Sequence, residues 1–317
     1  MIPFASPATL RRRGILGMNQ RNVGFIGQYN PRCNYPLVDD KLRTKKAAID
    51  NGIPVPRLYA TVDYQYQVAG VTAMLEPYDS FVIKPAQGSG GKGILVITGR
   101  RGDNFVKPSG QVIDSREVRR HASNILAGLH SLGGRNDTAM IEALIDFDPS
   151  LAQYSYEGVP DIRVIAFKGV PVMAMMRCAT HASDGKANLH QGAVGVGLDI
   201  ATGRSVRAVQ HDLLIERHPD TDACFKSLQI TDWTRVLDLA ASCVEMTGLG
   251  YLGADVVLDR RQGPMLLELN ARPGLAIQVA NQAGLQHRLA IAEEIAATAP
   301  DHDARIELAR QRFAVAD

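Results

Sequence analysis

Two side chains that can chelate a hard cation lie two residues apart near the carboxyl end of the chain. Glu268 and Asn270 belong to the apolar segment 266–274. Side chains at positions i and i+2 of a β-strand point to the same face, so both oxygens can reach one ion. Asp255 lies in a second apolar segment, 253–258, and a short turn connects the two. A hairpin would bring Asp255 beside the other two. The sequence therefore predicts an oxygen-only site for Mg²⁺ or Mn²⁺ on nucleotide phosphates, with an ordinary polar hairpin as the alternative.

A glycine-rich loop between two short apolar segments is the second candidate site. Residues 81–85 and 94–97 read as strands, and four glycines fall within residues 88–93 between them. Such a loop lets successive backbone N–H groups turn toward one anion, and Lys84 at its start adds positive charge. No helix follows the loop, which argues against a Walker P-loop and against a dinucleotide fingerprint. A flexible hairpin tip is the alternative. The loop residues that we expect to contact phosphate are Gln87, Gly88, Ser89, Gly90, Gly91, Lys92 and Gly93.

Lys41 and Glu142 complete a candidate nucleotide site. Lys41 lies in the first turn of a predicted helix, residues 39–50, where a cation is poorly placed unless an anion is near. Glu142 lies in an apolar segment, and its carboxylate can accept the exocyclic amine of adenine while the backbone of Ala143 to Ile145 reads the ring edge. Ordinary exposed side chains are the alternative for both.

The composition is that of a globular protein and points to no nucleic-acid or membrane partner. The 317 residues are 45% hydrophobic and 21% charged, with a formal net charge of +2. The arginines at 11–13 form a short cluster that reads as a solvated end. The four cysteines are widely spaced, which favours reduced thiols in a cytoplasmic protein over a zinc site or a disulfide framework. No apolar run approaches the ~20 residues that a membrane span requires.

The remaining pattern mixes strands and helices without strict alternation. Residues 161–167 and 170–177 read as a hairpin, and residues 23–27 are the one strand-like stretch of the N-terminal region. This order predicts an α+β fold rather than a doubly wound parallel sheet. The predicted helices beyond 39–50 are residues 115–132, 233–246 and 289–313, the last of them broken at Pro300.

In chain order, these segments resemble the ATP-grasp superfamily, and in particular RimK-type alpha-L-glutamate ligases and their uncharacterised relatives. The likeness covers roughly residues 38–290 and rests on the joint order of several short motifs. The motifs are DKLRTK at 40–45, GIPVP at 52–56, VIKP at 82–85, the glycine loop, IEALI at 141–145, DIRV at 161–164, MAMMR at 173–177, ANLHQG at 187–192 and LELNARPG at 267–274.

The resemblance implies an ATP-grasp fold in which two α+β lobes sandwich ATP. It also implies a reaction: ATP phosphorylates a substrate carboxylate, and an amine then displaces phosphate from the acylphosphate. Such chemistry needs positioning and positive charge rather than a protein nucleophile. The implied roles are Lys41 and Lys84 for the ATP phosphates, Glu142 for adenine, Asp255, Glu268 and Asn270 for the metal, Arg163 and Arg177 for catalysis and the substrate carboxylate, and Asn188, His190 and Arg272 for the substrate.

The chain departs from the family pattern in two respects. Only about 38 residues precede the Asp-Lys helix, where the family has a full α/β domain, and Lys186 and Gln191 stand where it has arginine. Arginine and lysine are not equivalent in gripping a carboxylate, so glutamate does not follow as the substrate. The expected boundaries are a shortened N-terminal segment at 1–38, an ATP-grasp domain at 39–290 with lobes of about 39–140 and 141–290, and a helical tail at 291–317.

The resulting hypothesis is an ATP-dependent, ADP-producing carboxylate–amine ligase that acts on small molecules or peptides. An ATP-binding protein of the same fold without ligase activity and a small-molecule kinase are the alternatives. We also expect a homodimer, in which residues 1–38 pack against the ATP-binding core and residues 23–26 add an edge strand at the interface.

Overall fold

The computed structural model describes residues 5–88, 90–131 and 133–315 of the chain. The chain forms two compact units. Unit 1 comprises the described parts of Met1–Asp39, Ala47–Pro54 and Phe147–Asp317, and unit 2 those of Asp40–Lys46 and Val55–Asp146. The domain boundaries expected from the sequence stay predictions.

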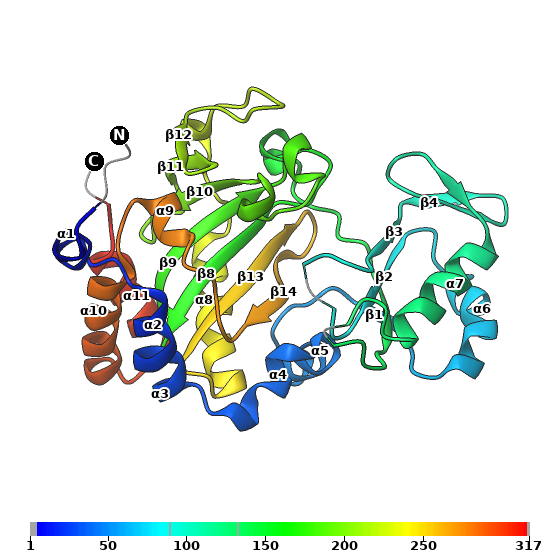
Figure 1. The fold of residues 1–317 in the computed structure, drawn as a ribbon, viewed down its shortest axis with the longest axis horizontal. Coiled ribbons are helices and arrows are strands. Elements are labelled where there is room, and N and C mark those ends of the chain that lie inside the picture. Colours follow the sequence, from blue (N-terminus) through cyan, green and yellow to red (C-terminus); the bar gives the residue numbers. More distant parts are fainter. Residues whose placement is uncertain (1–4, 89, 132, 316–317) are drawn as a thin grey trace. The chain divides into compact units, whose positions relative to one another are not determined.

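Unit 1 is built on an antiparallel sheet that has seven strands in the described residues, in the order β12-β11-β10-β9-β8-β13-β14 (Figure 1). Every residue of β13 (Tyr251–Asp259) is buried, although successive side chains point to opposite faces, so both faces of the sheet are covered there. The hairpins predicted around residues 168 and 259–264 are confirmed. The other strands are β8 (Asp161–Phe167), β9 (Val170–Cys178), β10 (Val194–Leu198), β11 (Ser205–Gln210), β12 (Leu213–Ile215) and β14 (Gly263–Asn270).

Helices of the second half of the chain pack against this sheet. The predicted helix 233–246 is confirmed as α8 (Trp233–Thr247), which contacts β8 and β13. The break at Pro300 is also confirmed, since α10 (Leu285–Thr298) ends before it and α11 (His302–Arg312) begins after it. Proline lacks a backbone N–H and disfavours helical geometry in the residue before it.

The N-terminal region of unit 1 is helical, and the prediction of a strand at residues 23–27 is wrong. Residues 21–26 form the π-helical turn η1, so they add no edge strand. Phe25 and Tyr29 are four residues apart and share one helical face, where both rings pack on Phe167 at 5.5 and 5.0 Å. A short apolar run does not distinguish a helix from a strand, and here tertiary packing decides. The elements are α1 (Pro7–Arg12), α2 (Met18–Gln20), η1 (Arg21–Ile26), α3 (Gly27–Tyr29), η2 (Arg32–Asn34) and α4 (Pro36–Asp39).

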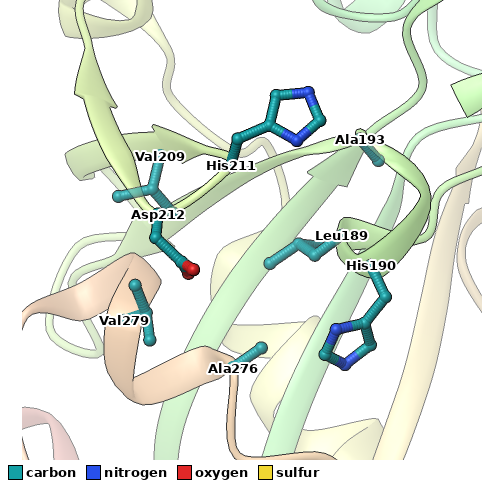
Figure 2. A pocket seen from close by; sticks show the side chains of 8 residues that line it. All are labelled: Leu189, His190, Ala193, Val209, His211, Asp212, Ala276 and Val279. Carbon is teal, nitrogen blue, oxygen red and sulfur yellow. The ribbon is translucent and has the colours of Figure 1, made fainter. Parts of the chain in front are cut away.

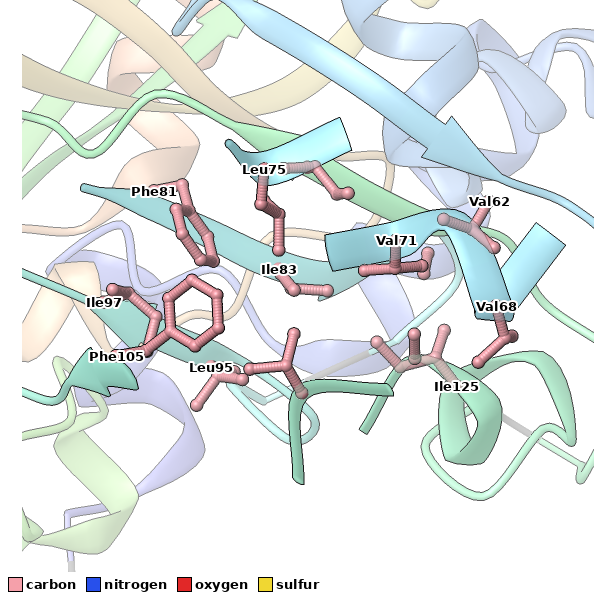
Figure 3. Packing of buried hydrophobic residues seen from close by; sticks show 14 of the residues in the cluster. Val62, Val68, Val71, Leu75, Phe81, Ile83, Leu95, Ile97, Phe105 and Ile125 are labelled. Carbon is pink, nitrogen blue, oxygen red and sulfur yellow. The ribbon is translucent and has the colours of Figure 1, made fainter. Parts of the chain in front are cut away.

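Unit 2 contains an antiparallel sheet in the order β1-β7-β2-β3 and a smaller one in the order β4-β5-β6. One buried apolar cluster joins them, in which the rings of Phe81 and Phe105 meet edge to face at 5.5 Å (Figure 3). The elements are α5 (Lys41–Asp50, within which the unit boundary falls), β1 (Leu58–Val62), η3 (Gln65–Gly70), α6 (Val71–Leu75), β2 (Phe81–Pro85), β3 (Leu95–Ile97), β4 (Gly99–Arg101), β5 (Asn104–Val106), β6 (Val112–Ile113), α7 (Ser115–Leu126) and β7 (Ala139–Glu142).

The predicted elements of unit 2 exist, but two of them end early. Helix α7 stops at Leu126 rather than at residue 132, because the chain turns at Gly128 with a φ of +77°. The apolar segment at residues 139–145 reads as a strand in the sequence, but the strand ends at Glu142. This second end matters for the site, because Glu142 is the last residue held by the sheet.

Candidate active site

Unit 2 buries one carboxylate between two ammonium groups. Glu142, at the end of β7, accepts a hydrogen bond from the Nζ of Lys84 on β2. The Nζ of Lys45 on α5 lies 3.1 Å from the other carboxylate oxygen and also donates to the carbonyl of Pro56. The three side chains belong to residues that are only 2 to 6% exposed. Charged groups are rarely this buried unless they are paired.

This cluster, which we call the lysine cluster (Lys45, Lys84 and Glu142), carries one more positive charge than negative when all three groups are ionised. Burial alone would raise the pKa of the Glu142 carboxyl, but the ammonium groups of Lys84 and Lys45 outweigh it and hold the pKa below its ordinary value. Burial lowers the pKa of Lys45, against the opposing attraction of Glu142. An added anion would relieve this imbalance, so the cluster suits a phosphate group.

Lys41 lies one helical turn before Lys45, and side chains four residues apart on a helix share a face. The carboxylate of Asp40 accepts hydrogen bonds from two backbone N–H groups of this first turn, at 2.9 and 3.1 Å. The Nζ of Lys41 donates to the carbonyl of Gly88 in the glycine loop, at 2.5 Å. The structure therefore brings Lys41 to the loop, as a shared phosphate site requires.

The glycine loop is held in shape by its neighbours in unit 2. The backbone N–H of Gln87 donates to both carboxylate oxygens of Asp137 at 3.1 Å, and burial raises the pKa of that carboxyl. Gly93 has a φ of +76°, and a Cβ there would lie 2.5 Å from the ring of His130, so only glycine fits. Of the other expected loop residues, Gly90, Gly91 and Lys92 are exposed, and Ser89 lies outside the described residues.

The three residues expected at adenine are placed differently from one another. The carboxylate of Glu142 faces the two lysines, and the N–H of Ala143 donates to the carbonyl of Arg57 at 2.8 Å. Ile145 is half-buried beyond the end of β7. An adenine contact for these residues stays a prediction.

Unit 1 places the predicted catalytic arginines against a predicted metal ligand. Arg163 donates to Asp255 through Nε at 2.7 Å and through Nη2 at 2.6 Å. Arg177 donates to Asp161 through Nε at 2.5 Å and Nη2 at 2.6 Å, and its Nη2 also lies 2.8 Å from Asp255. Sheet register explains the meeting, because Asp255 lies opposite Arg163 and Asp161 lies opposite Arg177. We call these four residues the arginine cluster.

When all four groups are ionised, the arginine cluster is balanced in charge, with two guanidinium groups and two carboxylates. Burial raises the pKa of the Asp161 carboxyl, against the opposing attraction of Arg177. Asp255 is only 2% exposed. Burial alone would raise the pKa of its carboxyl, but the guanidinium groups of Arg163 and Arg177 outweigh burial and keep the pKa below its ordinary value. Asp255 is therefore ionised, as a metal ligand must be, although both of its oxygens already accept hydrogen bonds.

The predicted metal ligands meet as the sequence indicated. Glu268 lies opposite Asp255 in the β13–β14 pairing, and the amide of Asn270 lies 3.4 Å from the Asp255 carboxylate. Glu268 and Asn270 are both half-buried. Three oxygen donors on one face fit the chemistry of Mg²⁺. The Asp255 carboxylate already accepts hydrogen bonds from Arg163 and Arg177, so an ion held by all three residues would compete with these arginines at Asp255.

The predicted substrate residues do not form one cluster. Asn188 caps the turn η6 (Leu189–Gln191) by accepting a hydrogen bond from the N–H of His190 at 3.0 Å. The ring of His190 is exposed and lines a cavity. Arg272 is exposed, and its guanidinium lies 5.1 Å from the ring centroid of Tyr35. Substrate roles for these residues stay predictions.

Two residues of these clusters were not singled out from the sequence. Lys45 was visible only as part of a motif, yet its spacing of four residues from Lys41 on a helix was a usable signal. Asp161 precedes Arg163 by two residues in a strand, so both point to one face. Alternation in the strand could have identified it.

The fold and the two charged clusters together define a protein of α+β ATP-grasp architecture. The chain belongs to the sugar-transfer associated ATP-grasp family, whose model matches residues 20–294. No curated protein matches the chain. Among the described residues, no helix is both long enough and apolar enough to cross a membrane.

Solved ATP-grasp structures resemble the chain at low identity. They include the D-cycloserine synthetase DcsG (15% identity, 98% of this chain and 82% of that chain, TM-score 0.48). They also include a RimK domain protein from Sphaerobacter thermophilus DSM 20745 (14%, 83% and 70%, 0.46) and the ligase PsnB complexed with minimal precursor (15%, 84% and 64%, 0.44). The chain spans less than two thirds of the length of the first two structures it matches, 64% and 61%.

Proposed function

We propose that the protein is an ATP-dependent ligase that joins a carboxylate to an amine and produces ADP and phosphate. Membership of an ATP-grasp family supports this class of reaction. A carboxylate oxygen attacks the γ-phosphorus and ADP leaves. The amine nitrogen then attacks the acyl carbon, loses a proton, and phosphate leaves with the pair of electrons of the broken C–O bond. A RimK-type ligase is the finer form of the proposal, and the acid it activates is undefined.

The observation that carries the proposal is the excess positive charge of the lysine cluster. Lys45 and Lys84 share one buried carboxylate, and Lys41 lies a turn from Lys45 at the glycine loop. We assign the holding of ATP phosphates to these lysines and to the loop. Mg²⁺, when bound at Glu268 and Asn270, would neutralise phosphate charge during transfer.

The arginine cluster is suited to bind the negatively charged group that is transferred in the reaction. In this proposal Arg163 and Arg177 stabilise the charge that develops on the acylphosphate, and Asp161 orients Arg177 through two hydrogen bonds. At least one of the three hydrogen bonds that Asp255 accepts from Arg163 and Arg177 must then pass to substrate oxygens. No protein nucleophile is needed for this step.

Trapping with hydroxylamine tests the proposal. The protein is incubated with ATP, Mg²⁺, hydroxylamine and pooled amino acids, short peptides and sugar acids, and both ADP and hydroxamate are measured. Only an acylphosphate yields a hydroxamate, so ADP without hydroxamate would indicate a kinase. Lys84→Met should remove both products, and the exposed residue Lys46 provides the matched control Lys46→Met.

A second candidate, nucleotide binding without ligation, is favoured by the occupied Asp255 carboxylate. Two arginines donate three hydrogen bonds to it. If these contacts do not open, ATP could bind at the lysine cluster without transfer. Tight ATP binding with neither ADP nor hydroxamate across the whole substrate pool would support this candidate instead.

A further inference from the structure

A large groove in unit 1 has no role in the chemistry proposed so far. Its volume is about 1010 Å³, and it lies between the N-terminal residues 13–21 and helix α9 (Ile277–Asn281). A smaller cavity of about 210 Å³ shares His190 and Asp212 with it. Sites for small molecules usually measure about 300–1,000 Å³, so the groove has room for more than a single amino acid.

The walls of the groove are fixed by close packing and by paired hydrogen bonds. Leu16 donates its N–H to the side-chain oxygen of Gln278 at 2.8 Å and accepts from its amide nitrogen at 3.1 Å. In the adjoining smaller cavity, which Leu189 lines, Gly195 on β10 lets that side chain approach closely, because a Cβ on Gly195 would lie 2.7 Å from Leu189. Gly195 lies directly opposite Arg177 in the sheet, so the turn that carries Leu189 and His190 is one strand from the arginine cluster.

One part of the groove is cationic. Arg13 and Arg21 line the larger cavity but not the smaller one. Arg21 donates to the carbonyl of Pro273 at 3.0 Å, which holds it beside the segment that follows β14. Within the described part of the chain, neither arginine forms an ion pair with a carboxylate. Uncompensated guanidinium groups on a cavity wall suit a carboxylate.

The other part, where the groove adjoins the smaller cavity, presents Asp212 and His190. Figure 2 shows the carboxylate of Asp212 pointing into the space between Val279 and Leu189, with His190 and His211 on the same cavity. In the described residues, the Asp212 carboxylate has no hydrogen bond or ion pair. A carboxylate without a protein partner in such a position suits an ammonium group.

Apolar side chains line the space between these charges. Ile15 and Leu275 are half-buried, while Met18 and Val279 are 65% and 40% exposed on the groove. Met18 is unbranched and adapts to different apolar partners. The groove therefore offers a carboxylate site, an apolar surface and an ammonium site.

We propose that this groove binds the amine substrate, and that this substrate is a zwitterionic short peptide with apolar side chains. Its ammonium group lies at Asp212, its carboxylate at Arg13 and Arg21, and its side chains on Met18 and Val279. Naming it the amine substrate rests on the proposed ligase function. The binding itself follows from the charges and shape of the groove alone.

Calorimetric titration of the full chain with leucyl-leucine, without nucleotide, tests the binding. N-acetyl-leucyl-leucine lacks the ammonium group and leucyl-leucine amide lacks the carboxylate. Each should bind at least about tenfold more weakly than the parent, since charge-assisted hydrogen bonds are the strong ones and each 1.4 kcal/mol is tenfold. Equal binding of all three peptides, or no binding of any, would overturn the proposal.

Variants assign the two ends of the peptide. Asp212→Asn should weaken leucyl-leucine about tenfold and leave the N-acetyl peptide unchanged, and Arg13→Gln should weaken leucyl-leucine while leaving the amide unchanged. Asparagine also tolerates the φ of +64° at Asp212. Arg21→Gln is the second cationic variant. The controls are Asp103→Asn and Arg12→Gln, both exposed and outside the groove. Groove variants that behave like the controls would overturn the proposal.

Hydroxamate formation and dipeptide binding, both measured on the same protein, distinguish this inference from the ligase proposal. Hydroxamate formation from ATP without any dipeptide binding would leave the ligase standing and refute the peptide groove. Dipeptide binding that depends on Asp212 and Arg13, with no ADP formed from any acid, would support the groove and refute the ligase.

Discussion

The two charged clusters of this protein both bury ionised side chains, but they differ in how the charges are balanced. The lysine cluster of unit 2 places two ammonium groups around the single carboxylate of Glu142. The arginine cluster of unit 1 pairs Arg163 and Arg177 with two carboxylates. When all of their groups are ionised, the first cluster has a positive charge in excess, whereas the second is neutral. A buried excess of charge is costly and indicates an absent counter-ion, whereas a neutral cluster is complete by itself.

This difference assigns different tasks to the clusters. A binding site for phosphate benefits from standing positive charge, because no internal contact has to break when the anion arrives. The arginine cluster must exchange some of its internal contacts for substrate contacts, so its binding energy is reduced by what it gives up. We therefore expect that substitutions in unit 2 can change the unfolding free energy and the affinity for ATP independently of each other. Substitutions in unit 1 should act on turnover.

The largest effect should come from the shared carboxylate. Glu142→Gln leaves Lys45 and Lys84 buried without a counter-charge, and breaking a buried ion pair costs about 3–5 kcal/mol of unfolding free energy. Urea unfolding followed by circular dichroism measures it. Glu76→Gln, at an exposed glutamate of the same unit, is the matched control and should stay within about 0.5 kcal/mol of wild type. Equal stability of the two variants would remove the argument for an excess charge.

The next effect concerns the metal. Glu268→Gln keeps the shape of the side chain but removes its charge, so Mg²⁺-dependent ADP formation should fall about 100-fold, or about 2.7 kcal/mol. Its unfolding free energy should remain within about 1 kcal/mol of wild type, because the side chain is half-buried. Glu216→Gln, at an exposed glutamate of unit 1, serves as the control. Full turnover of the Glu268 variant at saturating Mg²⁺ would exclude this residue as a ligand.

The sequence predicted the hairpin of Asp255 and Glu268 well because two local signals agreed. The apolar strands fixed alternation, and the turn between them fixed the register that places Asp255 opposite Glu268. The prediction from the sequence failed at residues 23–27. There the contacts of Phe25 and Tyr29 with Phe167 decide the conformation. Such contacts span more than a hundred residues, and no local pattern encodes them.

The pairing of the charged side chains could likewise not be predicted from local sequence patterns. Arg163 and Asp255 are 92 residues apart, and only the β8–β13 register brings them together. Reasoning from the sequence assigned a different partner to each of them, substrate for Arg163 and metal for Asp255. Lys45 is the opposite case, because its helical spacing from Lys41 was sufficient to suggest it as a site residue. Its burial, however, follows from the contacts of α5 with Glu142 and Pro56.

A smaller effect should separate stability from affinity within unit 2. Lys45→Met removes the excess charge, so the unfolding free energy should change by less than about 1 kcal/mol, as when a buried charge is replaced by an apolar group of similar size. Affinity for ATP should nevertheless fall about tenfold or more, because a charge-assisted contact worth roughly 1.5–3 kcal/mol is lost. Equilibrium binding of a fluorescent ATP analogue measures the second quantity. Lys46→Met, on the same helix but exposed, should match wild type in both measurements.

The smallest effect is the pH dependence of the Glu142 substitution. Because the pKa of Glu142 is lowered in the folded protein, its contribution to stability is fully present above the ordinary carboxyl pKa of 4.5 and is lost as the pH falls through the lowered value. Protonated glutamate resembles glutamine in charge, so the difference in unfolding free energy between wild type and Glu142→Gln should shrink steadily on acidification. Unfolding titrations of both proteins at several pH values measure that difference. A difference that stays constant down to the acid limit of folding would mean that Glu142 does not ionise as the lysine cluster requires, and would leave the two clusters electrostatically alike.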